Sequence, residues 1–172
     1  MKVTVVSIYE YETGSYRSFG ENELCQLWPI LEKAERLIGY NSEHFDLPIL
    51  HNYYLGDLSV INHLDIMKKV KESVGIRLKL NSIAMATLDM EKSADGLQAI
   101  KWWKEGKIDE IKKYCEQDVK VTKEIYEFGK NNKQLFYKSL VGEIIPFAVN
   151  FDFVSATKEA GGKKNINLTL PF

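Results

Sequence analysis

The stretch LIGYNSEHFDLPIL, residues 37–50, constrains the fold most, because it predicts a buried strand that turns directly into a helix. Its first three residues have the pattern of a strand end, and Asn41 then leaves the strand. Pro48 suits the first turn of a helix, since it has no N–H to leave unpaired and its φ is already helical. Asp46 is therefore expected at a strand-to-helix junction. There its carboxylate suits helix capping and metal binding equally well.

A second stretch, KYCEQDVKVTKEIYEFG, predicts a helix that carries Tyr114 and Asp118 on one face. The two residues are four positions apart, so their side chains project one turn from each other. Such a pair can work as a unit in which the carboxylate binds a divalent cation and the phenol orients a metal-activated water. The alternative is an ordinary amphipathic helix with an exposed Asp and a half-buried Tyr, and the pair alone does not decide between them.

The rest of the chain alternates between strand and helix patterns, which predicts an α/β fold. A hairpin is expected at Val3–Tyr11 and Tyr16–Phe19, and a short extended segment at His63–Ile66. Helical patterns cover the following ranges, the first of them interrupted at Pro29: Glu21–Glu35, Met67–Val74, Leu80–Leu88 with Asn81 or Ser82 as its cap, Leu97–Lys104 and Ile108–Phe128. The C-terminal part is expected to hold one or two strands in Val141–Phe153 and an extended tail over Asn165–Phe172.

The composition is that of a globular protein of ordinary domain size. The 172 residues are 45% hydrophobic and 27% charged, and no run of eighteen apolar residues predicts a membrane span. Two cysteines, Cys25 and Cys115, make no disulfide framework, and no signal peptide precedes the first strand. We therefore expect a cytoplasmic protein without a membrane segment.

Charge is distributed unevenly along the chain. Residues 1–65 hold 4 basic and 10 acidic side chains, whereas residues 66–138 hold 16 basic and 11 acidic ones. An acidic half beside a lysine-rich half is what a metal site with a phosphate-binding flank would show, although proteins that bind no nucleic acid share this pattern. Candidate phosphate contacts gather around one predicted helix junction, where a solvated face is equally expected: Lys101, Lys104, Lys107, Lys112 and Lys113.

Together, the two motifs resemble those of a known nuclease family. Asn41-x-x-x-Phe45-Asp46-x-Pro48, followed about 70 residues later by Tyr114-x-x-x-Asp118, is similar to the second and third exonuclease motifs of the DEDDy 3'-5' exonucleases. These enzymes belong to the ribonuclease H-like superfamily. The span from about residue 3 to residue 129 resembles the branch that includes the exonuclease domain of family B DNA polymerases and the YprB-type ribonuclease H-like domain.

The resemblance implies a three-layer α/β/α fold with a mixed sheet, and a domain boundary near residue 138. Residues 1–138 would form the ribonuclease H-like exonuclease domain, N-terminally incomplete, and residues 139–172 the C-terminal strands and tail. The family's first motif, an Asp-x-Glu on a central strand, is not found in this sequence. Glu10 and Glu12 match the family's hairpin turn and would be at most replacement ligands.

A missing central strand would leave unpaired backbone on two facing edges of the sheet. Three outcomes are expected from such a gap. In the first, the start is misassigned or the chain is truncated. In the second, the flanking strands close up, or another segment such as Gly142–Phe151 fills the gap. In the third, a partner chain donates a strand. The last outcome would produce an oligomer by strand exchange.

Carried over by motif, the family's site uses two divalent cations, Mg²⁺ or Mn²⁺. Asp118 would bind the cation nearest the nucleophile, Asp46 would support the second, and Tyr114 would orient the attacking water. Asn41 and Phe45 would line the substrate or support the ligands, and Lys112 and Lys113 would contact its phosphates. With two of the four carboxylates missing, metal affinity is expected to be weakened.

Two functions follow from this reading. The first is a 3'-5' exonuclease-like activity, two-metal-ion phosphodiester hydrolysis at the single-stranded 3' end of DNA or RNA. The second is a catalytically inactive nucleic-acid-binding or scaffolding module.

Overall fold

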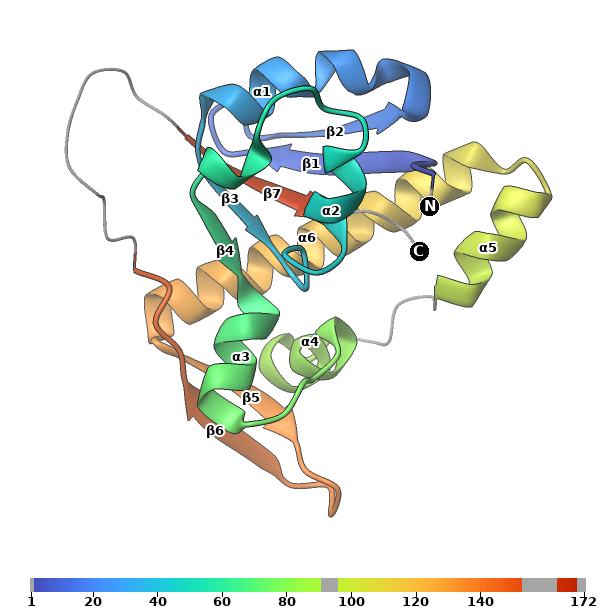
Figure 1. The fold of residues 1–172 in the computed structure, drawn as a ribbon. Helices are drawn as coiled ribbons and strands as arrows, with labels where there is room; N and C mark the ends of the chain where they lie inside the picture. The colour runs from blue at the N-terminus through green and yellow to red at the C-terminus, as the bar shows by residue number, and fades with distance from the viewer. Residues whose placement is uncertain (1, 91–95, 153–163, 170–172) are drawn as a thin grey trace.

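A five-stranded mixed sheet forms the centre of the protein, here described from a computed structural model that covers residues 2–90, 96–152 and 164–169 (Figure 1). The strand order is β2-β1-β7-β3-β4. β1 pairs antiparallel with both β2 and β7, whereas β3 pairs parallel with both β7 and β4. The strand bounds are β1 Val5–Glu10, β2 Ser15–Gly20, β3 Ala34–Gly39, β4 His63–Asp65 and β7 Lys164–Thr169.

Helices cover both faces of this sheet, as the ribonuclease H-like fold requires (Figure 1). One face packs against η1 (Glu21–Gln26), α1 (Trp28–Lys33), α2 (Asp46–His51) and η2 (Leu58–Val60). The other face packs against α3 (Ile66–Val74), α4 (Leu80–Leu88) and the long helix α6 (Ile108–Asn132), with α5 (Gly96–Lys104) beside the first part of α6. The predicted three-layer α/β/α architecture is confirmed.

Side chains alternate between the two faces along each strand, which explains how the sheet supplies apolar residues to the cores on both of its faces. On β1, Val6 and Ile8 join the cluster beneath α1 and α2, whereas Val5 packs under α6 with Ile111 and Cys115. Successive side chains of a strand point to opposite faces, so one strand serves two cores. On β7, Ile166 and Leu168 point to the same face as Val6 and Ile8. Asn167, between them, therefore lies on the opposite face, which α6 covers.

The central position of the sheet is filled by β7, from the C-terminal end of the chain. Its pairing with β1 runs from Ser7↔Thr169 to Glu10↔Ile166, and its pairing with β3 places Ile38 opposite Asn167. A segment of the chain therefore closes the expected gap, but it is not Gly142–Phe151, the segment we had named. Strand exchange between copies stays a prediction.

The segment that we had expected in the gap forms a separate hairpin instead. β6 (Ile144–Ala148) pairs antiparallel with β5 (Gln134–Lys138), and Pro146 faces Phe136 in this two-stranded sheet. Proline is tolerated there because the sheet has only two strands, both of them edges. The hairpin packs against α4 and α6, and the domain boundary near residue 138 stays a prediction.

Most predicted elements are present, with shifts at their ends. Pro29 lies in the first turn of a new helix, as expected of a helix that restarts there. The cap predicted for Leu80–Leu88 is wrong, because Lys79 precedes α4 and makes no side-chain cap hydrogen bond. The polar loop expected over residues 89–96 falls largely on residues 91–95, outside the described part of the chain.

Candidate functional site

The loop that follows β3 is fixed by a carboxylate from the neighbouring strand. Asp65, 5% exposed, accepts hydrogen bonds from the backbone N–H groups of Asn41 (2.9 Å) and Glu43 (3.1 Å). It also caps α3 by accepting from the Lys68 N–H at 3.3 Å. An aspartate directly before a helical run is a typical cap, whereas the hydrogen bonds to the 41–43 loop depend on the pairing of β3 with β4 and have no local signal in the sequence.

Two further details shape this loop. Asn41 has a φ of +64°, in the left-handed region that asparagine adopts more readily than most residues. A Cβ added at Gly39 would lie 2.2 Å from the Ser42 Oγ, so only glycine allows the chain to fold back this closely. Ser42 in turn is hydrogen-bonded to the His63 Nε2 at 2.8 Å. These contacts fix the loop between the end of β3 and the residues that precede α2.

Asp46 is the first residue of α2 and is only 4% exposed. Pro48 lies in the first turn of this helix, as predicted, and Leu50 anchors the helix in the core. The carboxylate of Asp46 is therefore held near the N-terminal N–H groups of α2 with little access to water. Phe45 takes the N-cap position of α2, so the N-cap role considered for Asp46 is wrong, although its charge suits the first turn; metal binding stays a prediction.

Tyr114 and Asp118 meet on α6 as their spacing predicts. The Tyr114 phenol donates a hydrogen bond to the Asp118 carboxylate, and the residues are 9% and 6% exposed. Burial raises the pKa of Asp118 from 3.8 to about 6, and the hydrogen bond from Tyr114 offsets part of that rise. In the described residues, no lysine, arginine or histidine nitrogen lies within 4.0 Å of this carboxylate. Asp118 is thus a buried acid without a cationic partner there.

The topology brings both motifs to the same end of the sheet. Asp46 follows the carboxyl end of β3, and β1 runs antiparallel to β7 and so begins at that same end. Val5, the first residue of β1, packs against Ile111 and Cys115, which flank Tyr114 on α6. α2 and α6 therefore approach this end from opposite faces of the sheet (Figure 1). A direct pairing of Asp46 with Asp118 stays a prediction.

The predicted substrate-binding residues lie in different surroundings. Asn41 lines a cavity of about 240 Å³ together with three cationic side chains and two acidic ones: Lys68, Lys71, Arg77, Glu43 and Asp65. Nothing in the spacing of these residues along the sequence marks this site. Phe45 precedes α2 and packs, half-buried, on the core below it. Lys112 and Lys113 lie in the first two turns of α6, where Lys113 pairs with Glu110 at 3.2 Å.

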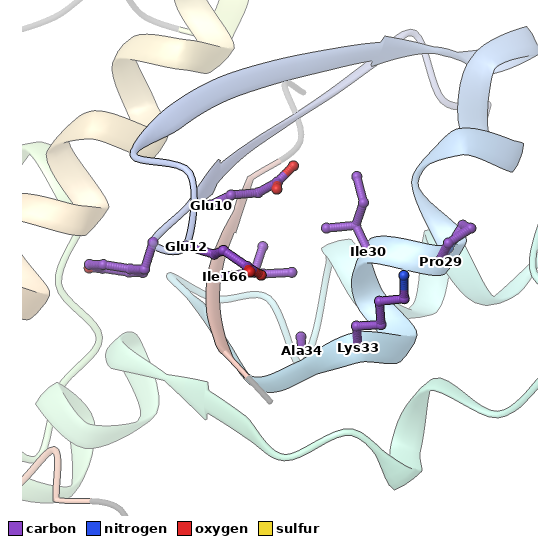
Figure 2. A pocket seen from close by; sticks show the side chains of 8 residues that line it. Glu10, Glu12, Pro29, Ile30, Lys33, Ala34 and Ile166 are labelled. Carbon is purple, nitrogen blue, oxygen red and sulfur yellow. The ribbon is translucent and has the colours of Figure 1, made fainter. Parts of the chain in front are cut away.

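The two glutamates considered as replacement ligands lie at the wrong end of the sheet. Glu10 faces Ile166, near the start of β7, and forms an ion pair with Arg17 at 2.9 Å. It lines a separate cavity of about 200 Å³ together with Glu12 and Lys33 (Figure 2). Since β1 spans six residues, about 17 Å of strand separates Glu10 from the end where Asp46 lies. The hypothesis that Glu10 or Glu12 replaces the ligands of the missing Asp-x-Glu motif is therefore wrong.

The carboxylates of this site have the chemistry that a hard divalent cation prefers, but the described residues supply too few of them for a full set of ligands. Oxygen ligands from aspartate are what Mg²⁺ and Mn²⁺ prefer, and a cation would offset the buried charge of Asp118. Within residues 2–90, 96–152 and 164–169, however, no group of three or more potential ligands is close enough to hold an ion. The central strand adds none, because residues 164–169 contain no aspartate or glutamate.

The sheet is mixed, helices cover both of its faces, and the buried carboxylates of Asp46 and Asp65 follow or end the parallel strands β3 and β4. A model of the RNase H superfamily matches residues 1–128, and the chain belongs to this superfamily. No curated protein and no solved structure gives a significant match. Membership indicates a nuclease-type function connected with nucleic acid. None of the described helices is long and apolar enough to cross a membrane.

Proposed function

We propose that the chain acts as a DEDDy-type 3'-5' exonuclease, hydrolysing single-stranded DNA or RNA from its 3' end. The observation that carries this proposal is Asp118, a buried carboxylate that has no cationic partner in the described residues and accepts a hydrogen bond from Tyr114. A charge kept out of water without a partner costs free energy. Functional sites are where such groups are found most often.

Asp118 and Asp46 are the residues that would hold a divalent cation, Mg²⁺ or Mn²⁺. When bound there, the cation supplies a water of lowered pKa and stabilises charge on the leaving oxygen. Tyr114 would orient that water, a role supported by the hydrogen bond from its hydroxyl to Asp118. Asn41 and Phe45 would line the 3' end of the substrate, and Lys112 and Lys113 would contact its phosphates.

The cavity beside Asn41 supports a polyanionic ligand. Lys71 and Arg77 on its rim are exposed, and neither forms an ion pair with a described residue, whereas Lys68 pairs with Glu43 at 2.9 Å. Unpaired cations next to a strand end attract phosphates and make affinity fall as salt rises. Under this proposal, the cavity would take up backbone phosphates of the strand.

An inactive nucleic-acid-binding module is the second candidate. It is favoured by the small number of candidate metal ligands, because the described residues hold no group of three such ligands and β7 contributes no carboxylate. The same fold would then bind a single strand without cutting it.

Hydrolysis of 5'-labelled single-stranded DNA and RNA, with Mg²⁺ or Mn²⁺, separates the two functions. We compare the wild-type chain with Asp118→Asn and with the matched control Asp109→Asn, an exposed aspartate on the same helix. The exonuclease proposal expects stepwise shortening from the 3' end. The rate should fall by about 100-fold or more in Asp118→Asn and stay near wild type in Asp109→Asn. Binding without hydrolysis in all three proteins would establish the inactive module instead.

A further inference from the structure

Helix α5 carries two adjacent tryptophans with opposite surroundings. Trp102 is half-buried and packs edge-on against Tyr114, with ring centroids 6.3 Å apart and planes at 62°. Trp103 is 56% exposed. Neighbouring residues on a helix point about 100° apart, so the two indoles face different surroundings. More than half of the Trp103 side chain is therefore open to a ligand.

The surface around Trp103 has a particular chemistry. α5 carries Lys101 and Lys104, both exposed, and no acidic residue. Neither lysine forms an ion pair with a described residue, whereas the nearby Lys107 is held by Glu105 at 2.7 Å. Ile100, 43% exposed, lies one turn before Trp103 and extends its apolar surface. α5 thus presents one exposed aromatic ring and, at other angles around the same short helix, two lysines whose long side chains carry positive charge, which is complementary to a ligand that is flat and aromatic at one point and anionic nearby.

We propose that Trp103 is a stacking platform for one base of single-stranded nucleic acid, with the long side chains of Lys101 and Lys104 contacting phosphates of the same strand. The inference rests on the proposed function, because it takes the ligand to be the strand that enters the site at Tyr114. Trp102 makes the connection: it touches Tyr114, and Trp103 is the next residue along the helix, about 3.8 Å further in Cα position.

A nucleic acid explains this surface better than a protein partner does. A protein interface large enough to be stable buries about 800 Å² per partner around an apolar centre. Among the side chains of α5 that the structure describes, only Ile100 and Trp103 expose a large apolar surface, and the same helix carries two exposed lysines. Base stacking on a single aromatic ring with flanking cations is how sequence-tolerant single-strand binders work.

Fluorescence anisotropy with a labelled oligo(dT) and a labelled oligo(U), in EDTA so that nothing is cut, tests the platform. Trp103→Ala should weaken binding by about 5- to 150-fold, which corresponds to a stacking contribution of about 1–3 kcal/mol. Trp103→Phe, which keeps an aromatic face, should recover most of the affinity. The control Ile144→Ala removes an equally exposed apolar side chain (53%) from the β5–β6 hairpin and should leave affinity unchanged.

An oligonucleotide series with one abasic position at a time identifies the stacked base. In the wild-type chain one abasic position should cost as much affinity as Trp103→Ala does, and in Trp103→Ala the same position should cost nothing further. Lys101→Gln combined with Lys104→Gln should lower the slope of log K against log salt by about 1.4. Circular dichroism and thermal melting confirm that each variant is folded.

Three results would overturn the inference, and each has a different consequence for the proposed function. Unchanged affinity in Trp103→Ala, with a wild-type chain that binds, removes the platform alone. Unchanged affinity together with a loss of self-association in Trp103→Ala, seen by light scattering, shows that a second copy occupies this surface. A wild-type chain that binds no single strand removes the platform and the proposed function together.

Discussion

Replacing Asp118 by asparagine should stabilise the protein while it removes activity. Burial holds the pKa of Asp118 near 6 in the folded chain, against 3.8 for an ordinary aspartate. The folded state therefore binds a proton more tightly than the unfolded state does. Stability contributed by the protonated acid is complete below about pH 4 and is lost as the pH rises through 6. At neutral pH the wild-type protein carries the full penalty.

The size of the effect follows from the two pKa values. A rise from 3.8 to about 6 corresponds to about 3 kcal/mol, at 1.36 kcal/mol per pKa unit. Asparagine has nearly the same shape, can still accept a hydrogen bond from Tyr114 and carries no charge, so up to about 3 kcal/mol should be regained at pH 7.5. For a chain of 172 residues that is about 6–12 °C in melting temperature.

Urea and thermal unfolding in EDTA, at pH 7.5 and at pH 4, measure this gain. It should be close to its full value at pH 7.5 and below about 1 kcal/mol at pH 4, where the wild-type acid is already protonated. Asp109→Asn, exposed in the first turn of α6, should instead lose a few tenths of a kcal/mol, because it removes a favourable charge at a helix N-terminus. Equal gains at both pH values, or a loss in Asp118→Asn at pH 7.5, would refute the claim that its charge is uncompensated.

Three further changes test other parts of the structure. Tyr114→Phe removes the hydrogen bond that lowers the pKa of Asp118, so that pKa should rise further. An NMR titration of the labelled Asp118 carboxyl measures this rise, and an unchanged pKa would show that the hydrogen bond is absent. Asp65→Ala leaves three backbone N–H groups without their acceptor and should cost about 2–4 kcal/mol in urea unfolding; a loss under 1 kcal/mol would mean that the loop does not depend on it. Asn167→Val tests the fully buried Asn167 amide, which lies beside the Tyr11 hydroxyl but has no partner of good hydrogen-bond geometry among the described residues. We expect a gain of about 1–3 kcal/mol, and destabilisation would show that Asn167 and Tyr11 are hydrogen-bonded.

Local chemistry made much of the site predictable. Pro48 marks the first turn of α2, and the four-residue spacing of Tyr114 and Asp118 leaves one geometry on a helix, so both motifs fold as their sequence indicates. The cap formed by Asp65 was predictable for the same reason, because an aspartate before a helical run accepts from the first turn. In each case the partners lie within a few residues of one another.

The central strand shows where local chemistry is insufficient. Residues 164–169 read KNINLT, a pattern with alternating polar positions that is equally suited to an edge or an extended tail. Its place depends on backbone partners in β1 and β3, more than 120 residues earlier in the chain, and no short motif records such pairing. The β5 strand was missed for a related reason: it follows α6 directly, after a single left-handed residue, Lys133.

The occupancy of the central position and the burial of Asp118 lead to one conclusion about the site. β7 completes the backbone hydrogen bonding of the sheet but brings no carboxylate, so it satisfies the fold without adding ligands. The buried charge of Asp118 meanwhile costs about 3 kcal/mol that no described residue offsets. If a divalent cation is what offsets it, Mn²⁺ should raise the melting temperature of the wild-type chain in a concentration-dependent way and leave Asp118→Asn unchanged. Equal shifts in both proteins would place the ion elsewhere and would separate the burial of Asp118 from metal binding.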